Sequence, residues 1–326
     1  MTPPDPRANP FFAGHEEAVR ALSHAARSGR LHHGWLLTGP KGIGKATLAY
    51  RFARWLLAGG QGADLFVPET AGVFRRVAAA THPDLFTVER RVNSKTEKLQ
   101  GEIVIATVQE ASAFMRLTPA EGGWRVVVID GAEDMNTNAA NALLKLLEEP
   151  PPRAILLLVS AAPGRLLPTI RSRCRVLPMA SLGDAAMHEL VRLYAPELDD
   201  AGQTRLIELA EGSIGAALSL TQGGGMALAA LVDEVLETRI RPARAQAIAD
   251  EVARVSEGAD KVELFFALLR ARLAGRIRAA ARAGAAHPPY DISLWQDFGK
   301  LERDVLGLNL DKRVAVITAL EQLHKS

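Results

Sequence analysis

The chain has a single cysteine, Cys174, among its 326 residues. An internal disulfide is therefore excluded, and no group of cysteines is available to hold a structural zinc ion. Long apolar runs are missing too, since none approaches the roughly 18–20 residues that cross a bilayer. The start, MTPPDPRANPFF, lacks a basic stretch followed by an apolar core, so we expect no secretion signal and no membrane partner, and a cytoplasmic location.

A strong excess of charge of one sign is also missing. The net charge of +2 is too small to indicate nucleic-acid binding by itself. Hydrophobic residues make up 48% and charged residues 23%, which is typical of a globular protein. Since domains usually run to about 100–200 residues, the length predicts two or three of them.

The first half alternates apolar strands with helical stretches, which is typical of a parallel sheet covered by helices. Strands are predicted at GWLLT, DLFTVE, WRVVVID and AILLLVS, and helices near residues 14–29, 45–60 and 136–149. Prolines 150–152 must end the third helix, because proline lacks the N–H that a helix interior uses. After about residue 180 the strand patterns stop. Helices are predicted from there on, with breaks near residues 195–200, 223–225, 241–244 and 286–291.

A glycine-rich loop follows the first predicted strand. Gly39, Gly42, Gly44 and Lys45 lie in GPKGIGK, which matches the phosphate-loop pattern G-x-x-x-x-G-K between a strand and a helix. In such loops the glycines let backbone N–H groups face the phosphates, and the lysine reaches the terminal phosphates. These four residues are candidates for nucleotide binding. The alternative is a glycine-rich turn without a ligand.

One residue expected in an ATPase is missing, and a second is present. The position after Lys45 normally supplies a hydroxyl to magnesium, but here it is Ala46. Thr47 does not replace it, because one residue along a helix is a rotation of about 100°. Asp130 ends a predicted strand as a magnesium-binding aspartate does, and its alternative role is a strand-end cap. Glu133 and Asp134 are explained by the helix dipole.

The loop and Asp130 occur in one order with three further motifs, THPDLFTV, NALLKLLEEPP and TIRSRC. Together they resemble the clamp-loader subunits of bacterial DNA polymerase III, a family of the AAA+ class, over about residues 10–220. The resemblance implies an α/β P-loop AAA+ domain with a parallel sheet at 1–179, a small helical lid at 180–222 and an all-α collar for oligomerisation at 223–326.

Members of this family open a ring-shaped sliding clamp and place it on primed DNA. The family contains ATP-hydrolysing motor subunits and a stator subunit that holds the ring together without hydrolysis. This chain departs from the motors at three positions: Ala46, then Gly131 in place of the water-activating glutamate, and Gly215 in GSIGAAL, where motors resemble GSxRxAL. The stator is therefore the predicted role, without intrinsic ATPase activity. The alternative is a motor subunit or a standalone AAA+ ATPase that uses Thr47 or Glu133.

One motif of the motors is kept. The arginine of SRC in this family reaches the nucleotide of a neighbouring subunit, and by position it is Arg173. A guanidinium is always charged and offers forked donors to phosphate oxygens. The alternative is a structural ion pair, and Arg171 and Arg175 are expected to be solvated or paired locally. The resemblance implies ATPase subunits and a delta subunit as partners, with the clamp and primed DNA reached through the complex.

The remaining predictions concern cofactors and other polar residues. Many relatives carry four zinc-binding cysteines before THPD, but residues 59–80 contain none, so no zinc is expected. No cofactor is required, and binding of ATP or ADP to the loop and Asp130 without hydrolysis stays open. His32 and His33 are assigned to packing or hydrogen bonding, and Ser160 is a candidate phosphate sensor. The arginines of residues 268–284 are interpreted as a solvated helix face rather than a DNA contact.

Overall fold

The computed structural model of the chain describes residues 5–92, 97, 99–121, 123–222, 224–254, 261–284, 289–308 and 310–323. Within them the chain divides into two compact units, with the boundary between Ala216 and Ala217. The predicted separation of a lid at residue 180 stays a prediction. The predicted start of the collar, Gly223, lies outside the described residues.

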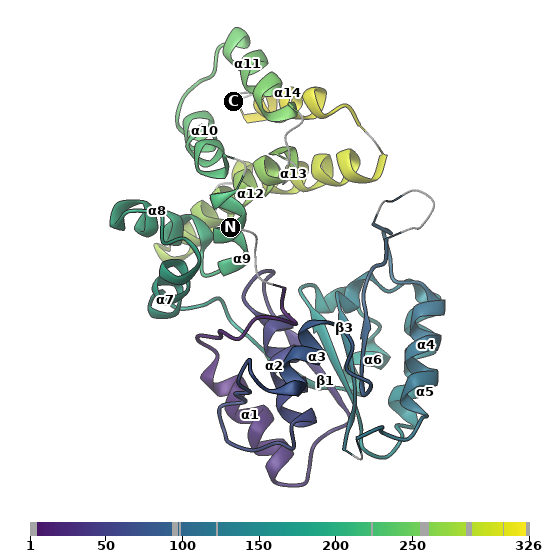
Figure 1. Ribbon diagram of the computed structural model, residues 1–326. Helices are drawn as coiled ribbons and strands as arrows, with labels where there is room; N and C mark the ends of the chain where they lie inside the picture. The colour runs from purple at the N-terminus through teal and green to yellow at the C-terminus, as the bar shows by residue number, and fades with distance from the viewer. Residues whose placement is uncertain are drawn as a thin grey trace. The chain divides into compact units, whose positions relative to one another are not determined.

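Five parallel strands form the sheet of the first unit, in the order β2-β3-β4-β1-β5 (Figure 1). They are β1 (Gly34–Thr38), β2 (Leu85–Val88), β3 (Arg125–Asp130), β4 (Ala154–Ser160) and β5 (Arg175–Pro178). The four predicted strands are confirmed. β5 was not predicted, because it lies at the sheet edge and three of its four residues are exposed, so it lacks the continuous apolar run of a central parallel strand.

Helices cover both faces of this sheet (Figure 1). One face carries α1 (Glu16–Arg27), α2 (Lys45–Leu57) and α3 (Gly72–Ala78), and the other carries α4 (Ile105–Met115), α5 (Thr137–Glu148) and α6 (Pro168–Ser172). Side chains alternate along each strand, so Trp35 and Leu37 pack toward α2 while Leu36 packs toward α5. Two short 3-10 turns, η1 (Ala132–Asp134) and η2 (Pro163–Arg165), follow β3 and β4.

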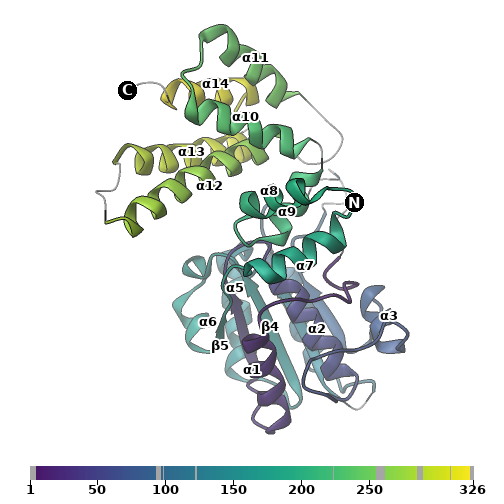
Figure 2. The same cartoon turned by 90° about the vertical axis from the view of Figure 1, so that its left-hand side faces the viewer.

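Among the described residues after β5, helices are the only regular elements, as predicted. The first unit contains α7 (Asp184–Tyr194), α8 (Asp200–Ala210) and the start of α9 (Ile214–Thr221). The second unit holds α10 (Gly225–Glu237), α11 (Pro242–Ala253), α12 (Lys261–Arg282), α13 (Pro289–Leu308) and α14 (Lys312–Leu323). Within it α12 and α13 lie side by side (Figure 2). The predicted fold class, a parallel α/β domain followed by helices, is confirmed.

No single helix among the described residues is long and apolar enough to span a membrane, and only the bent pair α9 and α10 reaches that length and composition together.

The segment that replaces the zinc module packs through apolar side chains. Leu65, Phe74 and Val77 of this segment are buried in the same core as α2. The buried Arg54 of α2 stacks its guanidinium on Phe74, 4.6 Å from the ring centre, and donates hydrogen bonds to the carbonyls of Arg7 and Asn9. These contacts join the N-terminal segment, α2 and α3. Among the described residues no group of His, Cys, Asp or Glu is arranged to hold a metal ion.

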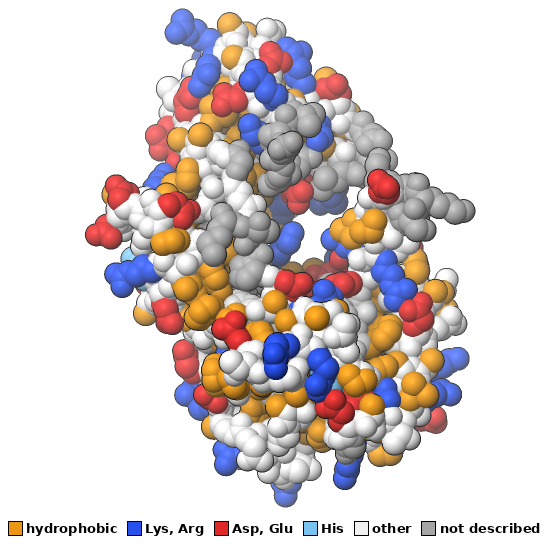
Figure 3. All heavy atoms as spheres, in the orientation of Figure 1, with side chains coloured by type: hydrophobic (Ala, Val, Ile, Leu, Met, Phe, Trp, Pro, Cys, Tyr) orange, Lys and Arg blue, Asp and Glu red, His pale blue; other side chains and the backbone are white. Residues whose placement is uncertain are grey.

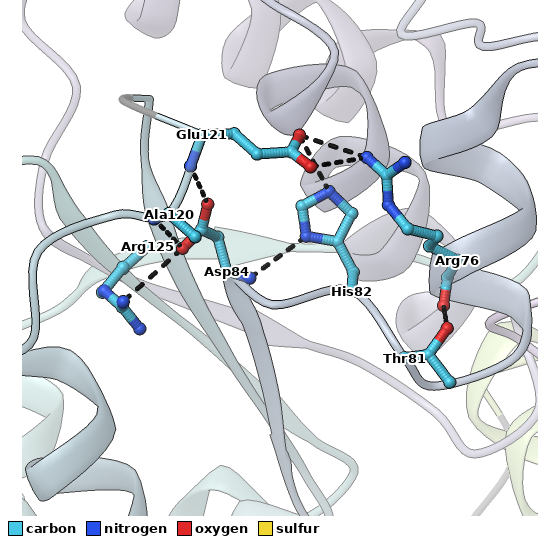
Figure 4. Close-up of polar contacts among 7 residues, drawn as sticks. All are labelled: Arg76, Thr81, His82, Asp84, Ala120, Glu121 and Arg125. Carbon is cyan, nitrogen blue, oxygen red and sulfur yellow. Dashed lines mark hydrogen bonds and ion pairs between the residues drawn. The ribbon is translucent and has the colours of Figure 1, made fainter.

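The THPD motif forms a polar network at the start of β2 (Figure 4). The buried carboxylate of Asp84 accepts the backbone N–H groups of Ala120 at 2.8 Å and Glu121 at 3.0 Å, and it faces Arg125 at 3.6 Å. His82 Nδ1 accepts the N–H of Asp84 at 3.2 Å. Asp84 precedes β2 and accepts hydrogen bonds from two N–H groups of the loop before β3. The motif therefore joins two strands of the sheet and has a structural role.

Replacing Asp84 with Ala should lower the free energy of unfolding by about 3 kcal/mol, because the N–H groups of Ala120 and Glu121 and the buried Arg125 lose their charged partner. Denaturant unfolding of the full chain measures this loss. Asp184→Ala, at an exposed aspartate of the same unit, is the control and should cost no more than about 1 kcal/mol. Equal losses for the two variants would contradict the structural role.

Burial lowers the pKa of His82 below its usual value of 6.5, although the Glu121 carboxylate opposes this effect. The unfolded chain therefore binds a proton near pH 6.5 and the folded chain binds it at lower pH, so stability should fall as pH falls below 6.5. His82→Asn keeps an acceptor for the N–H of Asp84 but does not titrate. Unfolding free energies at pH 7.5 and 5.5 should differ less in this variant, and an unchanged difference would contradict the assignment.

Candidate functional site

The predicted phosphate loop lies between β1 and α2, in the expected strand-loop-helix arrangement. Gly39, Gly42 and Gly44 have φ angles of 145°, 78° and 98°, which side-chain-bearing residues rarely adopt. The glycines therefore give the loop the backbone path of a phosphate cradle. Asp130 ends β3 and interacts electrostatically with Lys45 of this loop, so the structure brings the five predicted nucleotide-site residues together.

Lys45 is bound by the loop itself. Its Nζ donates to the carbonyl oxygens of Gly39 at 2.8 Å and Pro40 at 2.5 Å, and only 5% of the residue is exposed. Burial lowers the pKa of Lys45, while the Glu133 and Asp130 carboxylates act in the opposite direction. The ammonium group that would meet a phosphate is thus engaged by two carbonyls of its own loop.

The start of α9 packs directly on this loop. The Gly215 N–H donates to the carbonyl of Gly42 at 2.9 Å, and Ser213 Oγ donates to the carbonyl of Lys41 at 3.0 Å. A Cβ atom at Gly215 would lie 2.8 Å from the Cα of Gly42, closer than such atoms approach in proteins. No larger residue, including the arginine of the motor subunits, fits at position 215 while the two backbones stay in contact.

The two other substituted positions also have structural roles. Ala46 packs against the core around α2. Gly131 has a φ angle of 74°, and a Cβ atom there would meet Asp134 Oδ2 at 3.0 Å. A glutamate at position 131 would therefore be strained in this backbone.

The acids near the loop differ in their partners, and one buried oxygen, Glu133 Oε2, has no hydrogen-bond partner among the described residues. Burial raises the pKa of Asp130, and the nearby Glu89 and Glu133 carboxylates raise it further. The Lys45 and Arg7 cations act in the opposite direction and lower it. Arg7 contacts Glu89 at 2.6 Å. Glu133 accepts the N–H of Ala161 at 2.8 Å, so it links the end of β3 to the loop after β4.

Two neighbouring polar groups are also engaged. Asp134 pairs with Arg90 at 3.2 Å. The hydroxyl of Ser160, the candidate sensor, is buried and accepts the N–H of Ala162 at 3.2 Å. Both side chains therefore stabilise loops around the site.

Arg173 lies at the end of the sheet where the strands begin, whereas the glycine loop lies at the end where they finish. It precedes β5, and its carbonyl lies 3.5 Å from a Cβ built at Gly34, the first residue of β1. The loop follows the last residue of β1, so the length of the five-residue strand separates the two, about 13 Å at 3.3 Å per residue. The side chain is 37% exposed. An arginine placed there meets solvent, away from its own loop.

Two contacts hold the Arg173 side chain. Nη1 donates to the carbonyl of Thr169 at 3.2 Å, and Nη2 pairs with Glu148 at 2.8 Å. The ion pair, which was the alternative to a finger, is therefore present, and it joins TIRSRC to NALLKLLEEPP. Glu148 was not predicted as a partner of Arg173. The adjacent motifs were both visible, but nothing in the sequence showed that they meet in space.

His32 and His33 are used in hydrogen bonding and stacking, as predicted. Their rings lie 4.3 Å apart, and His33 Nε2 makes a hydrogen bond of 3.0 Å with the carbonyl of Leu147 at the end of α5. Burial is the main cause that lowers the pKa of His33. His33 therefore fixes the helix end that carries Glu148.

The arginines of α12 lie in part on a solvated face, as predicted, since the Arg276 side chain is 54% exposed, but they also form ion pairs that were not predicted. Arg270 pairs with Glu302 at 2.6 Å, Arg272 with Asp233 at 2.8 Å and Arg276 with Asp291 at 3.1 Å, all within the second unit. Their charges hold α12 to α13 and α10. On the face drawn in Figure 3, blue and red side chains are interspersed over the described residues, in keeping with the small net charge.

Residues 14–183 match a protein family described as DNA polymerase III, delta subunit. DNA polymerase III subunit delta' of Pseudomonas aeruginosa is 40% identical over 181 residues, which cover 56% of this chain and 53% of the relative. The delta' subunit of Escherichia coli is 33% identical over 60% of this chain and 57% of the relative. The tau subunit of Escherichia coli is 32% identical over 217 residues, which cover 64% of this chain and 31% of the relative. The chain thus spans about half the length of the two delta' relatives.

The closed loop predicts the effect of adding one methyl group. Gly215→Ala should lower the unfolding free energy by about 1–3 kcal/mol, although alanine favours a helix, because the added Cβ pushes α9 off Gly42. Gly164→Ala is the control, since nothing lies within 4 Å of a Cβ there. Denaturant unfolding measures both, and a stabilised Gly215→Ala chain would show that α9 and the loop are not packed in this way.

Proposed function

The chain belongs to the protein family described as DNA polymerase III, delta subunit, and from this premise we propose that it is a delta-prime-type subunit of the bacterial clamp loader. It acts as a stator: it holds the ATPase subunits in register and does not hydrolyse ATP itself. Its partners are those ATPase subunits and a delta subunit, and it reaches the sliding clamp and primed DNA through the complex.

The closure of the phosphate loop by α9 carries this proposal. A working loop must present its lysine to phosphates, but here Lys45 Nζ binds the loop carbonyls of Gly39 and Pro40, and α9 packs on the loop through the Gly215 N–H and the Gly42 carbonyl. Ala46 offers no hydroxyl to magnesium. To bind a triphosphate, Lys45 would have to leave its two carbonyl partners, and the site would still lack a metal ligand.

Arg173 supports action on a second chain. It lies at the other end of the strands from its own loop, so it cannot act on a nucleotide bound there. A guanidinium suits a nucleotide phosphate held by a neighbouring subunit. Arginines supplied in trans raise phosphoryl-transfer rates by about 10³-fold or more. The role is one of position, because such stabilisation depends on donors that are fixed before the reaction. A rigid subunit without its own hydrolysis can supply them.

The motor or standalone ATPase is the competing function, and the identity to a tau subunit is the reason to test it. It needs a rearranged Thr47 or Glu133. Glu133 is bound to the N–H of Ala161, so it would have to leave that bond to activate a water. No further contact in the described residues favours this alternative.

The purified chain should show no magnesium-dependent ATP hydrolysis above a blank, and calorimetric titration with Mg-ATP should give no binding at micromolar concentrations. The physical reason is that Lys45 already binds two loop carbonyls and Ala46 offers no hydroxyl to magnesium. An ATPase subunit of the same loader is the positive control. Sustained turnover by this chain alone would overturn the stator role.

Arg173→Ala in the reconstituted loader should slow the ATPase site that it faces by about 10³-fold, since the transition-state charge there loses its guanidinium. Single-turnover hydrolysis with clamp and primed DNA resolves that site from the others. Arg171→Ala, two residues away, is the matched control. A rate equal to that of the wild-type complex would remove Arg173 from the mechanism.

A further inference from the structure

We propose that Glu148 is a positioning residue for Arg173. Its carboxylate holds the guanidinium in the orientation in which it reaches a phosphate of the nucleotide bound by the neighbouring subunit. This inference rests on the proposed function, because it assigns Glu148 a part in the same reaction. Glu148 does not touch the nucleotide in this account and acts only through Arg173.

The Arg173 side chain needs such a partner. It follows α6, a helix of five residues, and is partly exposed, so a free side chain would populate many rotamers. Ordering an arginine costs about 2 kcal/mol of rotamer entropy, which the reaction would otherwise have to supply. A partner that orders it beforehand removes this cost from the chemical step.

The two contacts order the side chain without using all its donors. Nη1 binds the carbonyl of Thr169 and Nη2 binds Glu148, one hydrogen bond each. A guanidinium carries five N–H donors, so three are not needed for these bonds. Phosphate oxygens can therefore be bound while Glu148 keeps its place.

Glu148 is itself on a fixed support. α5 begins at a side-chain cap, in which Asn136 Oδ1 accepts the N–H of Ala139 at 2.9 Å, and its buried Leu146 and Leu147 pack in the core. At the other end His33 binds the carbonyl of Leu147. The carboxylate of Glu148 is thus attached to a backbone that the core holds in place, which a positioning residue requires.

The neighbouring residues provide matched controls. Glu149 is the next residue, is also exposed, and is not among the contacts of Arg173 in the described residues. Arg175 lies over the Trp35 ring, 5.0 Å from its centre, and is engaged elsewhere. The glutamate pair 148 and 149 therefore separates the contact with Arg173 from a general loss of negative charge.

The test is single-turnover ATP hydrolysis by the reconstituted loader with clamp and primed DNA, using Glu148→Ala, Glu148→Gln, Glu148→Asp, Glu149→Ala and Arg173→Ala. Glu148→Ala should lower the rate at the affected site about three- to tenfold without changing the ATP concentration at half-maximal rate. Gln keeps the length and one acceptor, so it should lose less, whereas Asp is too short and should resemble Ala. Glu149→Ala should match the wild type. Glu148→Ala combined with Arg173→Ala should be no slower than Arg173→Ala alone.

The outcomes separate the two proposals. If Arg173→Ala is slow but Glu148→Ala equals Glu149→Ala, the positioning role is wrong and the stator role stands. If Arg173→Ala equals the wild type, the finger role of Arg173 in the proposed function fails, and the positioning role of Glu148 fails with it. A Glu148→Ala rate above the wild type would also overturn the inference, because Glu148 would then withhold the arginine. Thermal unfolding of each isolated chain checks folding, and Glu148→Gln carries the test if the alanine variant does not fold.

Discussion

The parallel direction of all five strands is the constraint on which this account depends. In a parallel sheet all strands begin at the same end of the sheet and finish at the other end. Segments that follow strands therefore lie at one end, and segments that precede strands lie at the other. The glycine loop follows β1 and Asp130 ends β3, whereas Arg173 precedes β5. One chain therefore carries the glycine loop at one end of the sheet and Arg173, the proposed phosphate-binding side chain, at the other.

The chain retains the second of these features and has closed the first. Gly215 allows α9 to approach Gly42 so closely that the two backbones form a hydrogen bond, and Lys45 turns to the carbonyls of its own loop. Ala46 and Gly131 suit the closed loop, since one packs in the core and the other takes a left-handed backbone. Ala46, Gly131 and Gly215 thus all suit the backbone path of this site. Two acids near the loop also have partners within the chain, since Glu133 accepts a backbone N–H and Glu89 pairs with Arg7.

Much of this could be predicted from the sequence where the signal is local. Four buried strands have continuous apolar runs, and the loop has a glycine pattern with a mechanical meaning. β5 has no such run, because only one of its four residues is buried. The hydrogen bond between Gly215 and Gly42 joins backbones 173 residues apart, and no residue type marks it beforehand. The pair of Arg173 with Glu148 and the pairs of α12 were missed for the same reason: the sequence shows charged residues but not which of them meet.

The most direct measurement is a structure of the reconstituted loader with a non-hydrolysable ATP analogue. The account predicts that the Arg173 guanidinium lies within hydrogen-bonding distance, about 3 Å, of a phosphate oxygen bound by the adjacent ATPase subunit, while Gly215 still contacts Gly42 in this chain. An analogue seated in this chain's own loop, with α9 displaced and Arg173 facing solvent, would contradict it.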